Sequence, residues 1–131
     1  MPPRALLPAG TQPSKDNIRL SPGLISGSHV FLTGMTGSRP DGTMPENPED
    51  QFRQAFEKIG AVLREAGLGF DSIVDMTTYH IGLRDHFERF CAIHSQYISD
   101  PYPAWTAVEV AGLRREGAVV EIKVVAAIRE G

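Results

Sequence analysis

Apolar and polar positions alternate with a period of two near the end of the chain. The alternating segments are residues 101–113 and 117–128, which are rich in Val and Ala and predict a strand, a turn and a second strand. In the second segment neither side of the strand is simply polar, so a sheet that contains it needs cover on both faces. Helices of the same chain can cover one face of this sheet. Few elements of the chain remain to cover the other face, so we expect a second subunit to cover it.

The two predicted strands also carry polar side chains among the apolar ones. On the first, Trp105, Ala107 and Glu109 share a side, because side chains two residues apart point the same way. On the second, Glu121 and Lys123 share a side. We therefore expect the Trp105 side and the Glu121 side to form one mixed face, and this face is where we look for function.

Two earlier segments repeat apolar residues at steps of three and four, which is typical of amphipathic helices. The first is predicted to begin at Pro48, after the cap residue Asn47, and to stop at Gly67. Its apolar stripe consists of Phe52, Ala55, Phe56, Ile59, Val62, Leu63 and Ala66, and charged residues such as Lys58 lie away from it. The second is predicted to begin at Asp85 and to end before Pro101. Its inner side consists of Phe87, Phe90, Cys91, His94, Tyr97 and Ile98.

The remaining segments predict further strands, namely residues 17–26, 29–35 and 72–83. The last of these places Val74 and Met76 on one face. Residues 1–16 are rich in Pro and polar groups and are expected to be a loosely ordered lead-in. The predicted order is β-β-α-β-α-β-β in a single domain over residues 1–131, an α+β architecture with two helices on one face of a mixed sheet.

Composition narrows the function classes without naming one. The chain of 131 residues is 41% hydrophobic and 22% charged, which is ordinary for a globular domain, and no apolar run is long enough to span a bilayer. Its net charge of −3, without a basic cluster, disfavours nucleic acid as the main partner. The first residues lack the apolar core of a signal peptide, so we expect a cytoplasmic protein.

Metal and disulfide chemistry is not expected. The single cysteine, Cys91, excludes an internal disulfide and a zinc site built from cysteines. His86 and His94 lie eight residues apart on the second predicted helix, too far along its axis to share an ion. We therefore expect no metal.

Four short motifs carry a family resemblance. They are the LTG turn at Leu32 to Gly34, the AGL that ends the first helix at Ala66 to Leu68, the Pro-Ala followed by VEV at Val108 to Val110, and the VEI at Val120 to Ile122. Over about residues 17–129 the chain resembles the RidA family, also called the YjgF or reactive intermediate deaminase family. The resemblance implies a chorismate-mutase-like fold and a homotrimer, with helices outside, sheets wrapped into a central barrel and three clefts between subunits.

The resemblance also implies a reaction. Typical members hydrolyse enamines and imines released from amino acids to ammonia and a keto acid, without a cofactor. Glu121 stands at the position of the family's acidic residue, which is thought to position or activate water. Thr33 retains the serine or threonine that follows the equivalent of Leu32, and with Gly34 and nearby backbone groups it is expected to hold the reacting polar atom.

Four cleft positions depart from the family pattern. Trp105 replaces the arginine that binds the substrate carboxylate, and an indole cannot make that bidentate, charge-assisted contact. Leu20 stands where a tyrosine is often found, Cys91 where many members have asparagine, and Ala107 where a cysteine is common. The four are expected to line the substrate site, and the replacement of the arginine by Trp105 is expected to alter its substrate range.

Each candidate also has a purely structural interpretation. Glu121 can form an ion pair with Lys123, Thr33 can close a turn, and Trp105 can pack at an interface. Cys91 on an apolar helix face can be a small core residue, because no neighbouring base or cation is evident that would favour its thiolate.

Three functions therefore stay open. The first is a cofactor-free hydrolase for a small, less anionic enamine, imine or related C–N compound at clefts between subunits. The second is a non-catalytic trimer that binds a small apolar or aromatic metabolite against Trp105. The third is RNA cleavage or inhibition of translation, attributed to some relatives, which the acidic charge balance disfavours.

Overall fold

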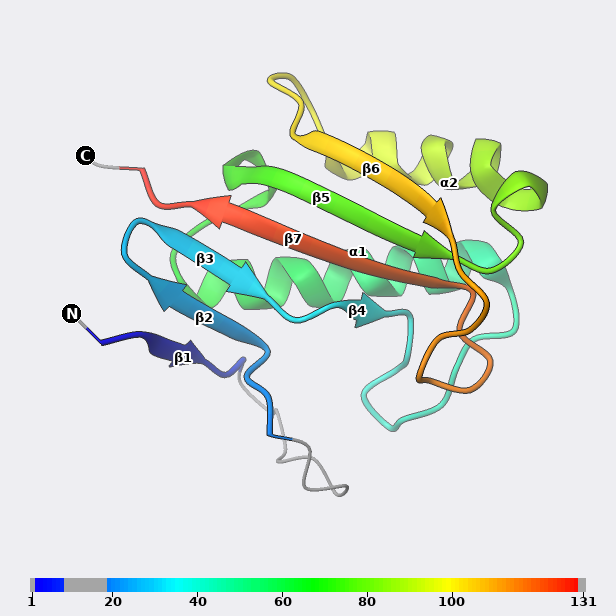
Figure 1. The fold of residues 1–131 in the computed structure, drawn as a ribbon, viewed down its shortest axis with the longest axis horizontal. Coiled ribbons are helices and arrows are strands. Elements are labelled where there is room, and N and C mark those ends of the chain that lie inside the picture. Colours follow the sequence, from blue (N-terminus) through cyan, green and yellow to red (C-terminus); the bar gives the residue numbers. More distant parts are fainter. Residues whose placement is uncertain (1, 9–18, 130–131) are drawn as a thin grey trace.

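A mixed β-sheet carries both α-helices on one of its faces (Figure 1). The computed structural model describes residues 2–8 and 19–129. The strands are β1 (Arg4–Leu6), β2 (Gly23–Ser26), β3 (His29–Leu32), β4 (Met35–Thr36), β5 (Ile73–His80), β6 (Ala104–Glu109) and β7 (Val120–Ala127). The helices are α1 (Pro48–Glu65), α2 (Leu83–Tyr97) and the short 3-10 helix η1 (Phe70–Ser72). The predicted α+β class and the two helices on one face are confirmed.

The strands lie in the order β1-β2-β3-β7-β5-β6, and β4 also pairs with β7. The last two strands, β6 and β7, were predicted to form a hairpin. This prediction is wrong, because β5 lies between β6 and β7 in the sheet. β6 is parallel to β5 and reaches it through α2, which is the crossover that a parallel pair requires. β7 then returns antiparallel to β5 on its other side.

The register of these strands separates two residues that were expected on one face. Trp105 pairs with Met76, and Met76 pairs with Val124, so Trp105 shares the buried face beneath the helices. Glu121 pairs with Tyr79 and therefore belongs to the opposite side of the sheet. The predicted mixed face is therefore wrong. Alternation shows which side chains of one strand point the same way, but the register between strands is needed to decide which side chains of two strands share a face.

The first strands also differ from the prediction. β1 pairs antiparallel with β2, so residues 4–6 are part of the sheet and not a loose lead-in. Residues 9–16 of that predicted lead-in lie outside the described residues. A β-bulge between Ile73 and Asp75 shifts the phase of β5, so that Val74 is 44% exposed while Met76 is buried. These two side chains therefore do not share a face, as the uninterrupted alternation had predicted.

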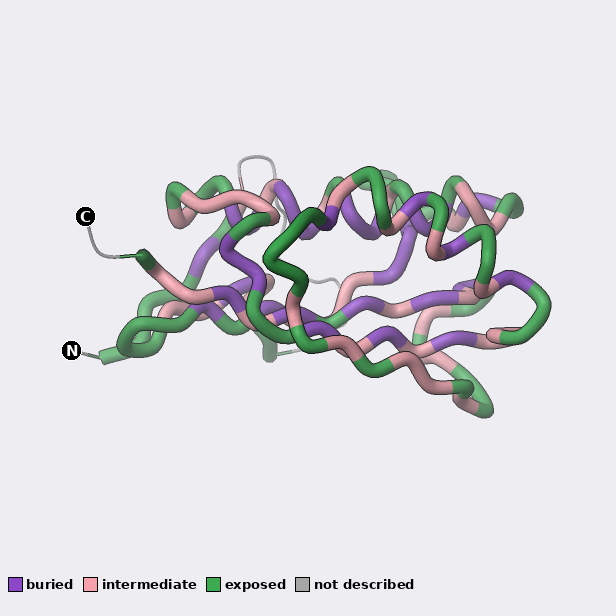
Figure 2. Tube along the Cα trace, turned by 90° about the horizontal axis from the view of Figure 1, so that it is seen from above, coloured by how far each residue is buried: buried purple, intermediate pink, exposed green. Residues whose placement is uncertain are grey.

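Helix α1 begins and ends close to where its sequence signals place it. The side-chain oxygen of Asn47 accepts a hydrogen bond from the backbone N–H of Glu49 at 2.8 Å, and Pro48 occupies the first turn. The predicted apolar stripe is buried from Phe52 to Leu63, and it packs on the sheet. Figure 2 shows the buried segments of helices and sheet facing each other between the two layers.

Replacing Asn47 with Ala is expected to lower the free energy of unfolding by about 1 kcal/mol, because one N–H of the first helical turn loses its acceptor. Urea denaturation of both proteins measures the difference. Asn47→Asp keeps a capping oxygen and serves as the matched control. Equal loss in both variants would show that the cap is not the cause.

Helix α2 begins at Leu83, two residues before the predicted start at Asp85. Gly82 precedes it with φ 75°, and a carboxylate from the end of β6 satisfies the first backbone groups. Glu109 accepts hydrogen bonds from Leu83 N at 2.8 Å and Gly82 N at 3.0 Å, and these bonds lower its pKa. The cap lies 26 residues from Leu83 in sequence, which is why a local capping pattern did not identify it.

Candidate functional site

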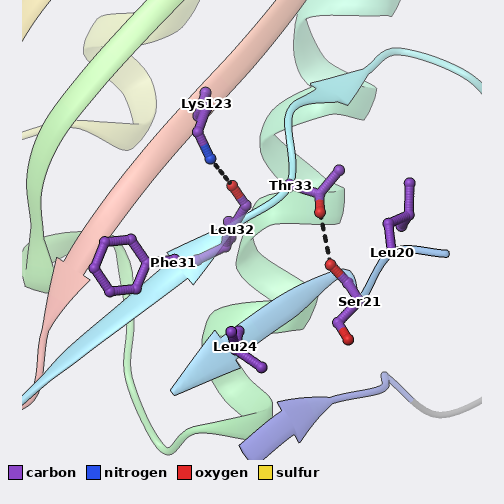
Figure 3. Close-up of a pocket in the computed structure, with 7 residues that line it drawn as sticks. All are labelled: Leu20, Ser21, Leu24, Phe31, Leu32, Thr33 and Lys123. Carbon is purple, nitrogen blue, oxygen red and sulfur yellow. Dashed lines mark hydrogen bonds between the residues drawn. The ribbon is translucent and has the colours of Figure 1, made fainter. Parts of the chain in front are cut away.

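A pocket of ≈ 300 Å³ lies where β2 and β3 meet the segment before β2 (Figure 3). Its lining consists of Leu20, Ser21, Leu24, Phe31, Leu32, Thr33 and Lys123. Phe31 pairs with Val125 of β7, so it shares a side of the sheet with Lys123 and Glu121. We call this side, opposite the helices, the open face. The pocket brings together two predicted site residues, Leu20 and Thr33.

The polar groups of the pocket have defined hydrogen-bonding roles. The Thr33 hydroxyl donates to Ser21 O at 2.6 Å, so its oxygen remains free to act as an acceptor for a bound N–H. The Lys123 ammonium donates to Leu32 O at 2.7 Å and has two further N–H donors. Both bonds are drawn in Figure 3. The pocket therefore offers an acceptor and a cationic donor between the apolar side chains of Leu20, Leu24 and Phe31.

Glu121 lies beside this pocket and depends on a glycine for its position. A Cβ atom at Gly34 would lie 2.5 Å from Glu121 Oε2, so only a residue without a side chain leaves room for the carboxylate. Gly34 follows Thr33, so the carboxylate lies against the residue next to the pocket. Thr33, Gly34 and Glu121 therefore lie close together, which a single site that uses all three residues would require.

Trp105 lies on the other side of the sheet, in contact with α2. Its ring stacks on His94, with centroids 4.4 Å apart and planes at 16°, and on Phe87 at 5.7 Å. Its indole N–H donates to Thr78 Oγ1 at 2.9 Å. The indole ring of Trp105 therefore stacks against α2, and its single polar group is engaged within its own chain. Its predicted role as a ligand wall stays a prediction.

Cys91 and Ala107 accompany Trp105 on this helix side. Cys91 lies on α2 one turn from Phe87, which contacts the indole, and Ala107 pairs with Thr78. Burial, with a smaller effect of Glu88, raises the pKa of the Cys91 thiol, which favours the interpretation of Cys91 as a packing residue. Among the predicted site residues, Leu20, Thr33, Gly34 and Glu121 thus form one group, and Cys91, Trp105 and Ala107 form another.

A chain of buried hydrogen bonds continues inward from Trp105. Thr78 Oγ1, which accepts from the indole, lies 2.8 Å from His80 Nε2, and His80 Nδ1 lies 3.0 Å from His86 Nε2. Desolvation, and then the neighbouring His86, lower the pKa of His80 to about 4, and desolvation chiefly lowers the pKa values of His86 and His94. Neutral imidazoles therefore occupy this part of the core.

Two lysines were not among the predicted site residues. Lys123 was placed on the predicted mixed face and considered as an ion-pair partner of Glu121, but the structure shows that it lines the pocket. Lys58 was placed among the charged residues away from the apolar stripe, yet it is half-buried and donates to Ser38 Oγ at 2.9 Å. No sequence signal connects Lys58 with Ser38, since the contact depends on how α1 packs beside β4.

The described part of the chain contains no cluster of three His, Cys, Asp or Glu side chains suited to a metal ion. Within the same residues, no helix is both long and apolar enough to cross a membrane.

Comparison with known proteins defines the class first. Protein YJGH, a solved structure, has a TM-score of 0.88 to this chain at 38% sequence identity, and the match covers 98% of each chain. The mixed sheet with its two helices is thus the chorismate-mutase-like fold. A family model described as Endoribonuclease L-PSP matches residues 12–128, and the chain belongs to this family, the RidA/YjgF family.

Sequence comparison with individual proteins leads to the same family. The RutC family protein YjgH of Escherichia coli (strain K12) is 39% identical over 127 residues, covering 96% of this chain and 95% of that protein. A protein of Bos taurus named 2-iminobutanoate/2-iminopropanoate deaminase is 29% identical over 99 residues, covering 74% of this chain and 71% of its own length. Family membership is therefore shown, and one relative's name describes an imine deaminase.

Proposed function

We propose that this protein is a cofactor-free hydrolase that releases ammonia from a small enamine or imine of low negative charge. The observation that carries the proposal is the position of Glu121, whose carboxylate lies against Gly34 beside the pocket that contains Thr33. A carboxylate next to a small pocket can take a proton from water, and an adjacent hydroxyl oxygen can accept a hydrogen bond from the substrate nitrogen. The name of the bovine relative agrees with this reaction class.

In the proposed reaction, an enamine first gains a proton from solvent on carbon, loses one from nitrogen and becomes the imine. Water, deprotonated by Glu121, forms a bond to the imine carbon, and Glu121 passes that proton to the nitrogen. Glu121 then takes the proton of the new hydroxyl group and passes it to the nitrogen as the C=O bond forms. The C–N bond then breaks, which yields ammonia and a carbonyl product. Thr33 holds the nitrogen by accepting its N–H, since the Thr33 proton is already donated to Ser21 O.

The proposed substrate is less anionic because the usual arginine is absent. Trp105 cannot bind a carboxylate through two parallel hydrogen bonds, and Lys123 provides only a point charge. The pocket walls, Leu20, Leu24 and Phe31, favour an apolar substituent. This arrangement favours small enamines in which the carboxylate is missing or masked.

A homotrimer would bring the two groups of site residues together. The open face exposes Phe31 (44%) and neighbouring Leu20 (49%), which is consistent with cover by another subunit. The groups containing Glu121 and Trp105 lie on opposite sides of the sheet, so in one cleft they must come from two subunits. Light scattering that gave the mass of one chain in solution would contradict this part of the proposal.

The test is ammonia release by the purified protein. Freshly generated 2-aminoacrylate provides an anionic enamine, and its neutral amide analogue provides a matched substrate without the carboxylate. We expect turnover of the amide and weak turnover of the acid. Absence of ammonia from every enamine and imine of such a panel, at enzyme concentrations comparable to substrate, would contradict the proposed function.

A second candidate function is non-catalytic binding of a small metabolite, which the apolar lining of the pocket favours. Calorimetric binding of a product-like amide without turnover of the corresponding enamine would support it. The RNA-cleavage alternative agrees with the description of the family model but not with the net charge of −3. RNA degradation by protein freed of contaminating nuclease would support that alternative.

A further inference from the structure

Lys123 is the one charged residue among the seven that line the pocket in the described part of the chain. The other lining side chains are aliphatic, aromatic or hydroxyl-bearing. An ammonium beside apolar side chains gains from a ligand that supplies a hydrogen-bond acceptor, because a polar group removed from water is costly unless it is bonded. The pocket therefore favours a ligand with an acceptor atom on the Lys123 side.

Lys123 lies opposite an irregularity in the sheet. Pairing of β7 with the chain of β3 and β4 is interrupted between two residue pairs, Phe31–Val125 and Met35–Ile122. In the interruption, three residues before β4 face two residues of β7, and one of these two is Lys123. One extra residue on one strand is a β-bulge, a device that redirects side chains and is frequent beside active sites.

The bulge brings the ammonium next to the acceptor of the pocket. Lys123 Nζ donates to Leu32 O at 2.7 Å, and the following residue is Thr33, whose hydroxyl oxygen can accept a further hydrogen bond (Figure 3). Consecutive residues lie ~3.8 Å apart between Cα atoms, so a molecule only a few bonds long can reach both groups. Such a molecule carries a hydrogen-bond donor and an acceptor oxygen on adjacent carbon atoms.

Glu121 bears on whether that acceptor oxygen is charged. Glu121 and Lys123 lie two residues apart on β7, so they share a side of the sheet, with Cα atoms about 7 Å apart. An anion bound by Lys123 would be repelled by this carboxylate. The carbonyl oxygen of an amide or ester accepts the same hydrogen bond without adding a negative charge, so the two side chains together favour a neutral carbonyl.

We propose that Lys123 is a specificity-determining residue that donates a hydrogen bond to a neutral carbonyl oxygen of the ligand. The substrate class is an enamine or imine whose reacting carbon bears an amide or ester group. The inference rests on the proposed function for the nitrogen group held by Thr33, and it adds the residue that recognises the neighbouring substituent. Lys123 keeps its bond to Leu32 O through one N–H and uses another for the ligand.

The alternative is that Lys123 only ties β7 to the Leu32 carbonyl across the bulge. A tether contributes to stability, but it does not distinguish two ligands that differ in a single carbonyl group. A residue that binds the carbonyl does distinguish them. The two roles therefore differ in ligand selectivity.

Binding of unreactive analogues to the full-length protein tests this selectivity. Methyl lactate has a hydroxyl donor next to a neutral ester carbonyl, 1-methoxypropan-2-ol has a methylene in place of that carbonyl, and lactate is the anionic counterpart. Titrations followed by the NMR shifts of backbone amides measure the three dissociation constants. We expect methyl lactate to bind at least about tenfold more tightly than the other two, because only it offers Lys123 a neutral acceptor. Binding of methyl lactate no tighter than that of either analogue would overturn the proposal.

Two variants assign the selectivity to Lys123. Lys123→Met keeps an unbranched side chain without an N–H and should weaken binding of methyl lactate about tenfold or more, with binding of 1-methoxypropan-2-ol unchanged. Lys123→Arg retains a cationic donor and should recover most of the lost affinity. Amide shifts away from the pocket that match those of the unaltered protein show that each variant is folded. If Lys123→Met weakened binding of both compounds equally, or of neither, the proposal would be wrong.

This test and the test of the proposed hydrolase can fail separately. Selective binding of methyl lactate without ammonia release from any enamine would support the carbonyl site of Lys123 and contradict the hydrolase. Ammonia release by Lys123→Met with an undiminished preference for carbonyl-bearing enamines would support the hydrolase and contradict the role of Lys123.

Discussion

Replacing Glu121 with Gln is expected to lower the rate of ammonia release by about 100-fold or more, because an amide cannot take a proton from water. Gln has nearly the same shape as Glu, so the contact with Gly34 and the fold should persist. Steady-state kinetics on the amide enamine measures the effect. The loss should appear in kcat, with KM changed little, because the substrate is held by Thr33 and the apolar walls.

Two further variants separate catalysis from simple loss of charge. Glu116→Gln removes an exposed carboxylate from the segment between β6 and β7 and should leave the rate unchanged. Gly34→Ala retains Glu121 but places a Cβ atom where its carboxylate lies, so it should also reduce kcat. Turnover by Glu121→Gln at the rate of the unaltered protein would show that Glu121 is not the base.

Periodicity within one element was a reliable guide because the backbone alone determines it. In residues 117–128 the alternation predicts that Val120, Ile122 and Val124 point to one side, and each is 0% exposed. The limits of α1 follow from Asn47 and Pro48 in the same way, since a cap acts on backbone groups two or three residues away. These features need no knowledge of the rest of the fold.

Relations between elements were not available from periodicity. Trp105 and Glu121 each lie on the predicted side of their own strand, but β5 separates β6 from β7, and the register puts the two side chains on opposite faces. The bond between Lys58 and Ser38 likewise depends on the packing of α1 beside β4. Motif resemblance identified Thr33 and Glu121, because they are matched residue by residue, but it could not show that Lys123 lines the pocket beside Thr33.

The core histidines should make the folded state unstable in mild acid. His80 is 0% exposed, and burial with the neighbouring His86 lowers its pKa from 6.5 to about 4. The unfolded chain therefore binds a proton at this site more readily than the folded chain between these two values, so the free energy of unfolding falls as the pH falls through this window. The difference in pKa corresponds to a loss of about 3 kcal/mol at pH values below 4.

Urea denaturation at a series of pH values from 7.5 to about 4 measures this effect against His80→Asn. Asn keeps a hydrogen-bonding group beside Thr78 but does not titrate, so the variant should be less stable at pH 7.5 and should lose less further stability in acid. His86 and His94 remain in the variant, and burial lowers the pKa of each, so part of the acid sensitivity should persist. Parallel stability curves for the two proteins would mean that His80 binds protons equally in the folded and unfolded states, and His80 would then not be a source of acid sensitivity.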